Sequence, residues 1–255
     1  METIDKIKNF KIIHWNCNSI NNKFEEFKIF LNKHNPDIIM LNETKINDFT
    51  ANNLFSQLIN YKFLHKQRSE KNGAGGVAIL FKAEIQFEIC NLLDDLDLEL
   101  IAIKIIVNKK EIVVLSYYNP PNCKLSEEIF NKLSQAKITF IMMGDLNSKT
   151  KSIGCIQDNS NGSILEKIIS NNDCIILENN EHTYFNFRKD KNFSDKLDLA
   201  ICSSALFNKI KNLVVFKNED MTSDHAPIQI EIVLSKKKKR IKRRKKKKKL
   251  QLYYY

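Results

Sequence analysis

ITFIMMGDLN, residues 138–147, starts as an apolar run of strand length and ends in the polar group Gly144-Asp145-Leu146-Asn147. A short apolar run bounded by a turn signal is typical of a buried strand. The Asp145 carboxylate and the Asn147 amide therefore stand where this strand stops. Ligands often bind at strand ends, because loops can converge there while the sheet holds them rigid.

Other apolar runs are followed by polar residues in the same way, at Asn16, Glu43 and Tyr118. Asp198 interrupts a further run, and the pair Asp224-His225 precedes the last one. Each group alone is typical of an ordinary turn or helix start. Together they supply hard oxygen ligands for Mg²⁺, amides to orient water or phosphate, and a histidine for acid–base chemistry. The set therefore predicts a metal-assisted phosphodiesterase. Zinc fits less well, because the set has one histidine and no paired cysteines.

The pattern along the chain predicts strands that outnumber helices by roughly two to one, and therefore packed sheets covered by helices. Helix-like spacing covers 24–31 and 126–136, and residues 108–110 are typical of a hairpin turn. Residues 10–234 form one continuous unit without a linker or a repeat. We expect residues 1–9 to be a leader and 235–255 to be a disordered tail.

Composition places the chain among ordinary globular proteins, with 43% hydrophobic and 28% charged residues. The six cysteines are at least 19 positions apart, which excludes a CxxC zinc or redox motif. The first ten residues are charged, unlike a signal peptide. No apolar run approaches the ~20 residues that span a membrane. We therefore expect an intracellular protein without a membrane partner, and the pattern leaves the oligomeric state open.

Positive charge is concentrated in residues 236–249, where 13 of 14 positions are Lys or Arg, and without them the formal charge of +11 becomes −2. Three interpretations of this tail stay open: a nuclear localisation signal, a nucleic-acid tether, or read-through of a shifted reading frame. A dense cationic run binds DNA or RNA with strong salt dependence. The tether interpretation involves in particular Lys236, Lys237, Arg240, Arg243 and Arg244.

Seven motifs in one order resemble those of the endonuclease/exonuclease/phosphatase family, and most closely the apurinic-endonuclease-like domain of non-long-terminal-repeat retrotransposons. The resemblance spans residues 10–234 and implies an α/β (α+β) four-layer sandwich, with two mixed β-sheets packed face to face and helices outside. Its motifs are WNCNSI (15–20), PDIIMLNET (36–44), GGVAILF (75–81), YYNPP (117–121), GDLN (144–147), LDLAICSS (197–204) and SDHAPI (223–228).

The resemblance implies that Glu43 is the principal ligand of Mg²⁺, or of Mn²⁺ in its place. It also places Asn16 and Asp224 with the metal-binding residues. Many relatives have an acidic residue where this chain has Asn18. That departure removes a second carboxylate and leaves Asn18 as a weaker, substrate-binding member of the site.

The same resemblance implies the roles of three further residues at strand ends. Asp145 orients and deprotonates the attacking water. Asn147 donates its amide to the phosphate as negative charge develops there. Tyr118 hydrogen-bonds the phosphate or the leaving oxygen.

His225, by the same resemblance, binds the scissile phosphate, and a neighbouring carboxylate fixes its tautomer and raises its pKa. The resemblance implies that this carboxylate is Asp198, while the sequence itself leaves Asp198 and Asp224 both open. Thr183 has two interpretations of equal weight. It lies in a loop that meets DNA in such domains, or it is a β-forming residue in an ordinary strand.

The leading hypothesis is therefore a Mg²⁺-dependent DNA endonuclease that leaves a 3′-hydroxyl and a 5′-phosphate, as in target-site nicking by a retrotransposon. This activity would take place in the nucleus. One alternative is a phosphatase or phosphodiesterase of the same superfamily with a substrate other than nucleic acid. Another is a non-catalytic module that binds nucleic acid through the tail.

Overall fold

The computed structural model describes residues 9–68, 75–107, 109–188, 191–219 and 221–233. The predicted polybasic tail, the tether residues within it and almost all of the predicted leader lie outside the described residues. The helices are α1 (Phe24–His34), α2 (Asp48–Phe55), α3 (Glu127–Gln135), α4 (Ser160–Asn171) and α5 (Ser204–Phe207), with 3₁₀ turns at Asn21–Lys23, Asn91–Leu93 and Lys151–Ile153.

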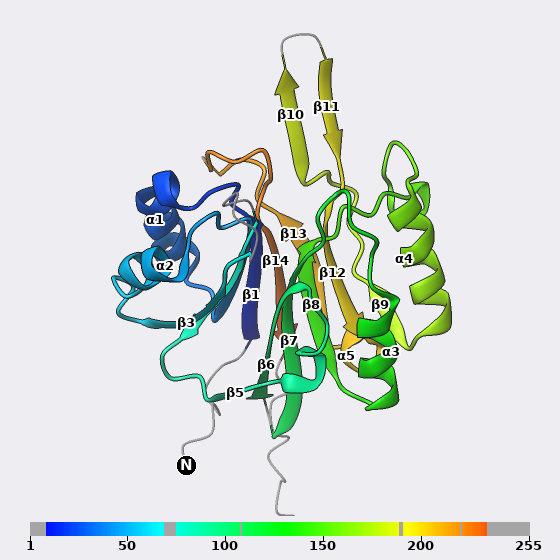
Figure 1. Cartoon of the computed structure of the whole chain (residues 1–255), viewed down its shortest axis with the longest axis horizontal. Helices are drawn as coiled ribbons and strands as arrows, with labels where there is room; N and C mark the ends of the chain where they lie inside the picture. Colours follow the sequence, from blue (N-terminus) through cyan, green and yellow to red (C-terminus); the bar gives the residue numbers. More distant parts are fainter. Residues whose placement is uncertain (1–8, 69–74, 108, 189–190, 220, 234–255) are drawn as a thin grey trace, which may run out of the picture.

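Two six-stranded mixed sheets form the body of the molecule (Figure 1). The first has the order β13-β14-β1-β2-β4-β3, with β1 and β2 parallel. Its strands are β1 (Asn9–Asn16), β2 (Ile38–Asn42), β3 (Tyr61–Lys66), β4 (Val77–Lys82), β13 (Ile210–Val215) and β14 (Ile228–Val233).

The second sheet has the order β5-β6-β7-β8-β12-β9, with β7 and β8 parallel. Its strands are β5 (Phe87–Ile89), β6 (Glu99–Val107), β7 (Lys110–Tyr118), β8 (Phe140–Asp145), β9 (Cys174–Ile176) and β12 (Asp198–Ser203). A separate hairpin, β10 (Tyr184–Arg188) and β11 (Lys191–Asp195), stands out from the body in Figure 1.

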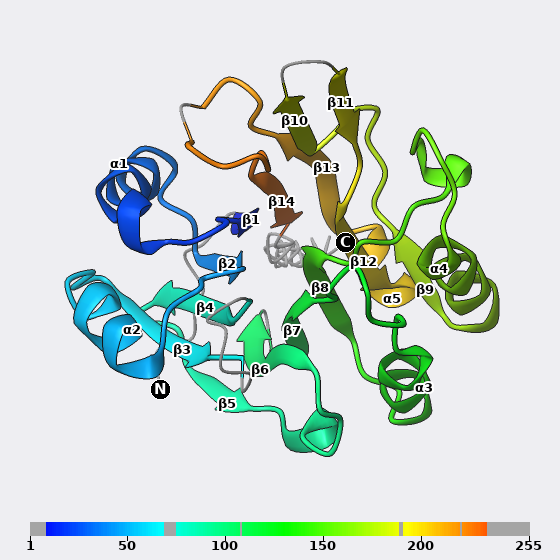
Figure 2. The same cartoon turned by 45° about the horizontal axis from the view of Figure 1, so that its top comes forward.

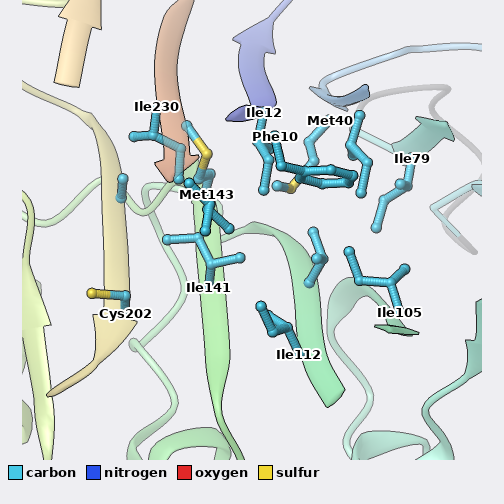
Figure 3. Close-up of a cluster of buried hydrophobic side chains, with 14 of the residues drawn as sticks. Phe10, Ile12, Met40, Ile79, Ile105, Ile112, Ile141, Met143, Cys202 and Ile230 are labelled. Carbon is cyan, nitrogen blue, oxygen red and sulfur yellow. The ribbon is translucent and has the colours of Figure 1, made fainter. Parts of the chain in front are cut away.

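The two sheets pack face to face through β-branched and other apolar side chains, which alternate along each strand. Phe10 and Ile12 of β1 lie in this layer with Ile141 and Met143 of β8 (Figure 3). Ile13 and Trp15, which point the other way from β1, pack beneath α1 and α2. The core between the sheets therefore holds two rigid frames together.

Helices cover the outer faces of both sheets, α1 and α2 on the first and α3 and α4 on the second (Figure 1). The resulting arrangement is helix, sheet, sheet, helix, so the predicted four-layer sandwich is confirmed. Among the described residues, no helix combines the length and apolar character needed to cross a bilayer.

Local sequence signals explain where several helices begin and end. Helix α1 has Glu25 and Glu26 in its first turn, which suits the positive end of the helix dipole. It ends at Asn35, whose φ of 44° is left-handed and whose N–H donates to Leu31. The predicted helix over 126–136 matches α3, and the predicted hairpin turn joins β6 to β7. The projecting β10–β11 hairpin is not among the strands expected from the sequence.

Candidate active site

The strand ends that carry polar residues meet at one end of the two-sheet body (Figure 2). Strands β1, β2, β7 and β8 finish there with Asn16, Asn42, Tyr118 and Asp145, and the antiparallel β12 begins there with Asp198. Side chains from both sheets therefore converge, as expected from the sequence.

Asp145 is buried at the centre of this group. Its Oδ2 accepts from Asn16 Nδ2 at 2.9 Å, and its Oδ1 accepts from the backbone N–H of Asn147 at 3.0 Å. Burial raises the pKa of Asp145 to about 7, with Asp198 adding to the effect, while His225 and the two hydrogen bonds act against it. A carboxyl with this pKa can accept a proton near neutral pH.

The Asp145 backbone is held by a side chain from the opposite sheet. Its N–H donates to Asn42 Oδ1 at 2.9 Å, and Asn42 in turn donates to Ser116. At Gly144, a Cβ atom would lie 1.7 Å from the Tyr117 carbonyl oxygen, so only glycine fits there. The glycine of the GDLN motif thus permits the close approach of β8 to β7.

His225 faces Asp145 on one side and Asp198 on the other. Its Nδ1 lies 2.8 Å from Asp198 Oδ2, and its Nε2 lies 3.9 Å from Asp145 Oδ2. Burial acts to lower the pKa of His225, but the charge and hydrogen bond of Asp198 outweigh it and raise the pKa to about 9. Of the two candidates from the sequence, Asp198 and not Asp224 is the one that bonds the ring.

Asp198 is itself completely enclosed. Burial acts to raise its pKa, yet the charge of His225 and hydrogen bonds from His14 and His225 hold that pKa below the ordinary range. Its backbone N–H donates to Thr183 Oγ1 at 3.0 Å. Asp198 is therefore an ionised carboxylate within a nearly dry site.

Glu43 accepts three hydrogen bonds at the edge of the group. Its Oε1 accepts from the Tyr118 hydroxyl at 2.8 Å and from Asn16 Nδ2 at 3.2 Å, and its Oε2 pairs with Lys45 Nζ at 2.8 Å. Although burial acts against ionisation, these partners lower the pKa of Glu43. The lowered pKa keeps the Glu43 carboxylate charged. Its side chain is 18% exposed, which leaves the carboxylate open to solvent.

The donor chemistry around Glu43 suits one hard divalent cation. Within the described ranges, no three His, Cys, Asp or Glu residues gather as a complete metal cage. Mg²⁺ does not need one, because it usually keeps several waters and binds one or two carboxylates together with substrate phosphate. The Glu43 carboxylate fits such a site. Asn16 turns its Nδ2 toward Glu43, and its Oδ1 accepts from the Asn18 N–H at 3.1 Å, so in this arrangement Asn16 supports the carboxylate and does not itself offer an oxygen ligand.

Strained backbone conformations cluster at this end of the molecule. Of the eight non-glycine residues with positive φ in the described segments, five belong to the loops around the site. Asparagine tolerates this left-handed region, but glutamate, serine and lysine rarely adopt it. Such strain is typical of functional sites, where the fold holds side chains in fixed directions. The five are Asn18, Ser19, Glu43, Lys45 and Asn147.

Two of the predicted site residues lie differently from expectation. Asp224 Oδ1 accepts from Asn18 Nδ2 at 3.0 Å, so Asp224 is engaged with Asn18 at the rim and not with Glu43. Thr183 is 1% exposed, and its hydroxyl accepts from the amides of Leu197 and Asp198. This placement favours positioning of Asp198 over the predicted contact with DNA.

Three residues outside the predicted set belong to the site: Asn42, Lys45 and His14. Asn42 and Lys45 flank Glu43 within the motif PDIIMLNETK. Their place at the end of a buried strand could have identified them as candidate site residues. His14 lies inside an apolar strand, and its sequence context is typical of a core residue.

A family model described as endonuclease-reverse transcriptase matches residues 112–229, a segment that includes Tyr118, Asp145, Asp198 and His225. The matched segment therefore resembles the endonuclease/exonuclease/phosphatase family. This match confirms the resemblance drawn from the seven motifs. It also confirms the expectation of an enzyme of the phosphodiesterase type.

Among curated proteins, this chain is similar to the RNA-directed DNA polymerase from mobile element jockey. The Drosophila funebris protein is 22% identical over 223 residues, which are 87% of this chain and 24% of that protein. The Drosophila melanogaster protein is 23% identical over 219 residues, 86% of this chain and 23% of that protein. The chain therefore spans about a quarter of the length of these relatives.

Solved structures share the fold of this chain. The endonuclease domain of TRAS1, a telomere-specific non-LTR retrotransposon, has a TM-score of 0.71 at 17% identity, covering 88% of this chain and 99% of that one. An AP endonuclease from Archaeoglobus fulgidus has a TM-score of 0.68 at 18% identity, covering 88% and 100%. These likenesses show that the two-sheet architecture is the same.

Proposed function

We propose that this domain is a divalent-metal-dependent DNA endonuclease that cuts one strand and leaves a 3′-hydroxyl and a 5′-phosphate. The observation that carries the proposal is the facing pair Asp145 and His225, 3.9 Å apart, beside the open carboxylate Glu43. The similarity to endonuclease domains and to retrotransposon polymerases supports DNA as the substrate.

Asp145 and His225 divide the work of hydrolysis between them. The raised pKa of Asp145 suits a base that takes the proton from an attacking water. The raised pKa of His225 suits a cationic donor to the scissile phosphate as negative charge develops. Breakage of the bond between phosphorus and the 3′-oxygen then gives the two proposed ends.

Two neutral side chains complete the reacting group. Asn147 lies two residues after the end of β8, with its backbone N–H bonded to Asp145 and its side-chain Nδ2 3.1 Å from the Asn119 carbonyl oxygen. This side-chain amide would turn from Asn119 to donate to a phosphate oxygen. The Tyr118 hydroxyl, now bonded to Glu43, is placed to reach the phosphate or the leaving oxygen. A Mg²⁺ or Mn²⁺ ion held by Glu43, with Asn16 in support, would neutralise phosphate charge and stabilise the leaving oxygen.

We also propose that the polybasic segment holds DNA near this site in the nucleus. The described part of the chain carries the reacting side chains, whereas the concentrated positive charge lies in residues 236–249. Cationic segments bind duplex DNA largely through counterion release, without reading sequence. RNA is a second polyanion that the same segment could hold.

Nicking of supercoiled plasmid tests the proposal directly. We expect open-circular product with Mg²⁺ or Mn²⁺ and none with EDTA, and none from Asp145→Asn with either metal. Polymerase extension and ligation of the nicked product identify a 3′-hydroxyl and a 5′-phosphate. Release of inorganic phosphate from lipid or inositol phosphates, without nicking, would overturn the choice of substrate.

A further inference from the structure

A histidine on the first strand extends the hydrogen-bond chain behind His225. His14 belongs to β1, is completely buried, and places Nε2 3.0 Å from Asp198 Oδ1. The other oxygen of the same carboxylate, Oδ2, lies 2.8 Å from His225 Nδ1. Asp198 is thus held between two imidazole rings, one on each oxygen.

The bridge crosses the layer between the two sheets. Alternation along β1 places His14 on the same face as Phe10 and Ile12, which both lie in the core between the sheets. Asp198 is the first residue of β12 in the opposite sheet, and His225 lies three residues before β14, which belongs to the first sheet. Both sheets therefore contribute to the position of one carboxylate.

The partners of the two ring nitrogens of His14 show which nitrogen donates a hydrogen bond. A carboxylate only accepts, so the shared proton is on Nε2 of His14. The opposite nitrogen, Nδ1, is buried without a hydrogen-bond partner. The ring is therefore a donor toward Asp198 through Nε2.

Packing alone does not account for this residue. The preceding positions on the same face of β1 are Phe10 and Ile12, and an apolar side chain at position 14 would fill the space without an unpaired nitrogen. Burial of a polar ring with one unpartnered atom lowers stability, and the hydrogen bond made by the other nitrogen offsets part of that cost. Among the described residues, Asp198 alone supplies that hydrogen bond.

We propose that His14 is a positioning residue for the hydrolysis described above, on which this inference rests. By occupying Oδ1, His14 stops rotation of the Asp198 carboxylate about χ2, a torsion that otherwise has a broad energy minimum. Oδ2 then stays directed at Nδ1 of His225. The far nitrogen of His225 consequently stays directed at Asp145 and the space for phosphate.

Substitution of His14 by two residues of different chemistry tests the role. His14→Leu removes the donor and fills the space, whereas His14→Gln keeps a side-chain N–H donor of similar reach. Loss of an outer hydrogen-bond partner typically costs about 10–100-fold, so we expect His14→Leu to lower kcat for nicking by that amount with KM little changed. His14→Gln should recover most of kcat. His34→Leu, which removes a histidine–carboxylate pair with Glu219 at the surface, is the matched control and should leave kcat unchanged.

A second measurement does not depend on catalysis. The Nδ1 proton of His225 is shared with Asp198, so its ¹H and ¹⁵N resonances report the geometry of that hydrogen bond. We expect His14→Leu to shift them, His14→Gln to shift them less, and His34→Leu to leave them in place. In an Asp198→Asn background, the effect of His14→Leu on kcat should disappear, because its partner is already changed.

The outcomes separate this inference from the proposed function. If wild-type protein does not nick DNA, the proposed function fails, and the resonances of His225 still decide whether His14 positions the ring. If His14→Leu folds with unchanged His225 resonances and unchanged kcat, His14 is only a bridge between sheets and the proposal is overturned. If His14→Leu does not fold, the comparison of His14→Gln with His14→Asn, whose shorter amide falls short of Asp198, decides the same question.

Discussion

The side-chain amide of Asn16 donates to Asp145 at 2.9 Å and so links the last residue of β1 in one sheet to the last residue of β8 in the other. The same Nδ2 atom lies 3.2 Å from Glu43. A neutral donor therefore stands between two carboxylates that would otherwise repel each other. The site depends on this amide for both its geometry and its charge balance.

Asn16→Asp should reduce nicking by about 10-fold or more, because it replaces a shared donor by a third negative charge. Asn16→Ala, which removes the donor without adding charge, should reduce it less. Single-turnover nicking at fixed Mg²⁺, with thermal unfolding to confirm the fold, measures both. Equal activity of Asn16→Asp and wild type would show that the amide does not balance the two carboxylates.

Asp145→Asn should remove hydrolysis while preserving DNA binding. The amide has the same shape but cannot accept the proton of water, and loss of a general base lowers the rate by about 10²-fold or more. Single-turnover nicking and DNA affinity are the measurements. Asp37→Asn is a matched control and should nick normally. Asp37, which directly precedes β2, is also a buried carboxylate and pairs with Lys82. Normal affinity with only a small loss of rate would assign the base elsewhere.

His225→Ala should likewise abolish most turnover, by about 10²-fold or more, through loss of a donor to the developing phosphate charge. The ring is almost fully buried against Asp198 and Tyr184, so thermal unfolding must accompany the kinetics. His225→Gln retains a donor and should keep more activity than alanine. If the two variants are equally active, hydrogen bonding by His225 does not contribute to the rate.

The general arrangement of the site could be predicted because its residues follow short apolar runs. Asp145, Glu43 and Tyr118 each come directly after a buried strand, so local pattern alone brings them to strand ends. The parallel pairs β1–β2 and β7–β8 then bring those ends together. The alternation of strands and helices predicted packed sheets covered by helices, and the four-layer order was implied by the family resemblance.

The partners of individual atoms could not be predicted, because they depend on how the two sheets register across the core. His14 and Asp198 are 184 positions apart, and nothing near either residue indicates their contact. Asp224 adjoins His225 in sequence, yet the ring bonds Asp198, 27 positions away. Thr183 likewise serves the backbone of Asp198, a contact that the pattern of its own segment does not contain.

Glu43→Gln should weaken the binding of the metal ion without disturbing the fold. The amide keeps the contacts with Tyr118 and Asn16 within reach but lacks the charge that attracts Mg²⁺. We expect nicking to fall at low Mg²⁺ and to recover in part at higher Mg²⁺, measured as a titration of the metal. Glu231→Gln, on β14 and paired with Lys211, is the control and should titrate like wild type. The ligand assignment is wrong if Glu43→Gln also matches wild type at limiting Mg²⁺.

Removal of residues 236–255 should weaken DNA binding and flatten its salt dependence without abolishing nicking. The remaining chain keeps Glu43, Asp145 and His225, but its formal charge falls to −2. The logarithm of affinity for duplex DNA falls with that of salt by a slope of about −0.9 per phosphate neutralised, so partial engagement of 13 cations is measurable. Because a tether adds affinity and not chemistry, the deficit should shrink as substrate approaches saturation.

A full-length variant with the 13 cations replaced by glutamine separates charge from chain length. If the segment acts as a tether, this variant and the truncated chain should show the same reduced salt slope and the same kcat. Loss of nicking at saturating DNA, with the fold preserved, would mean that the segment helps to build the reacting complex. An unchanged salt slope in both variants would mean that the cations do not touch DNA, and read-through would then be the better explanation of the tail.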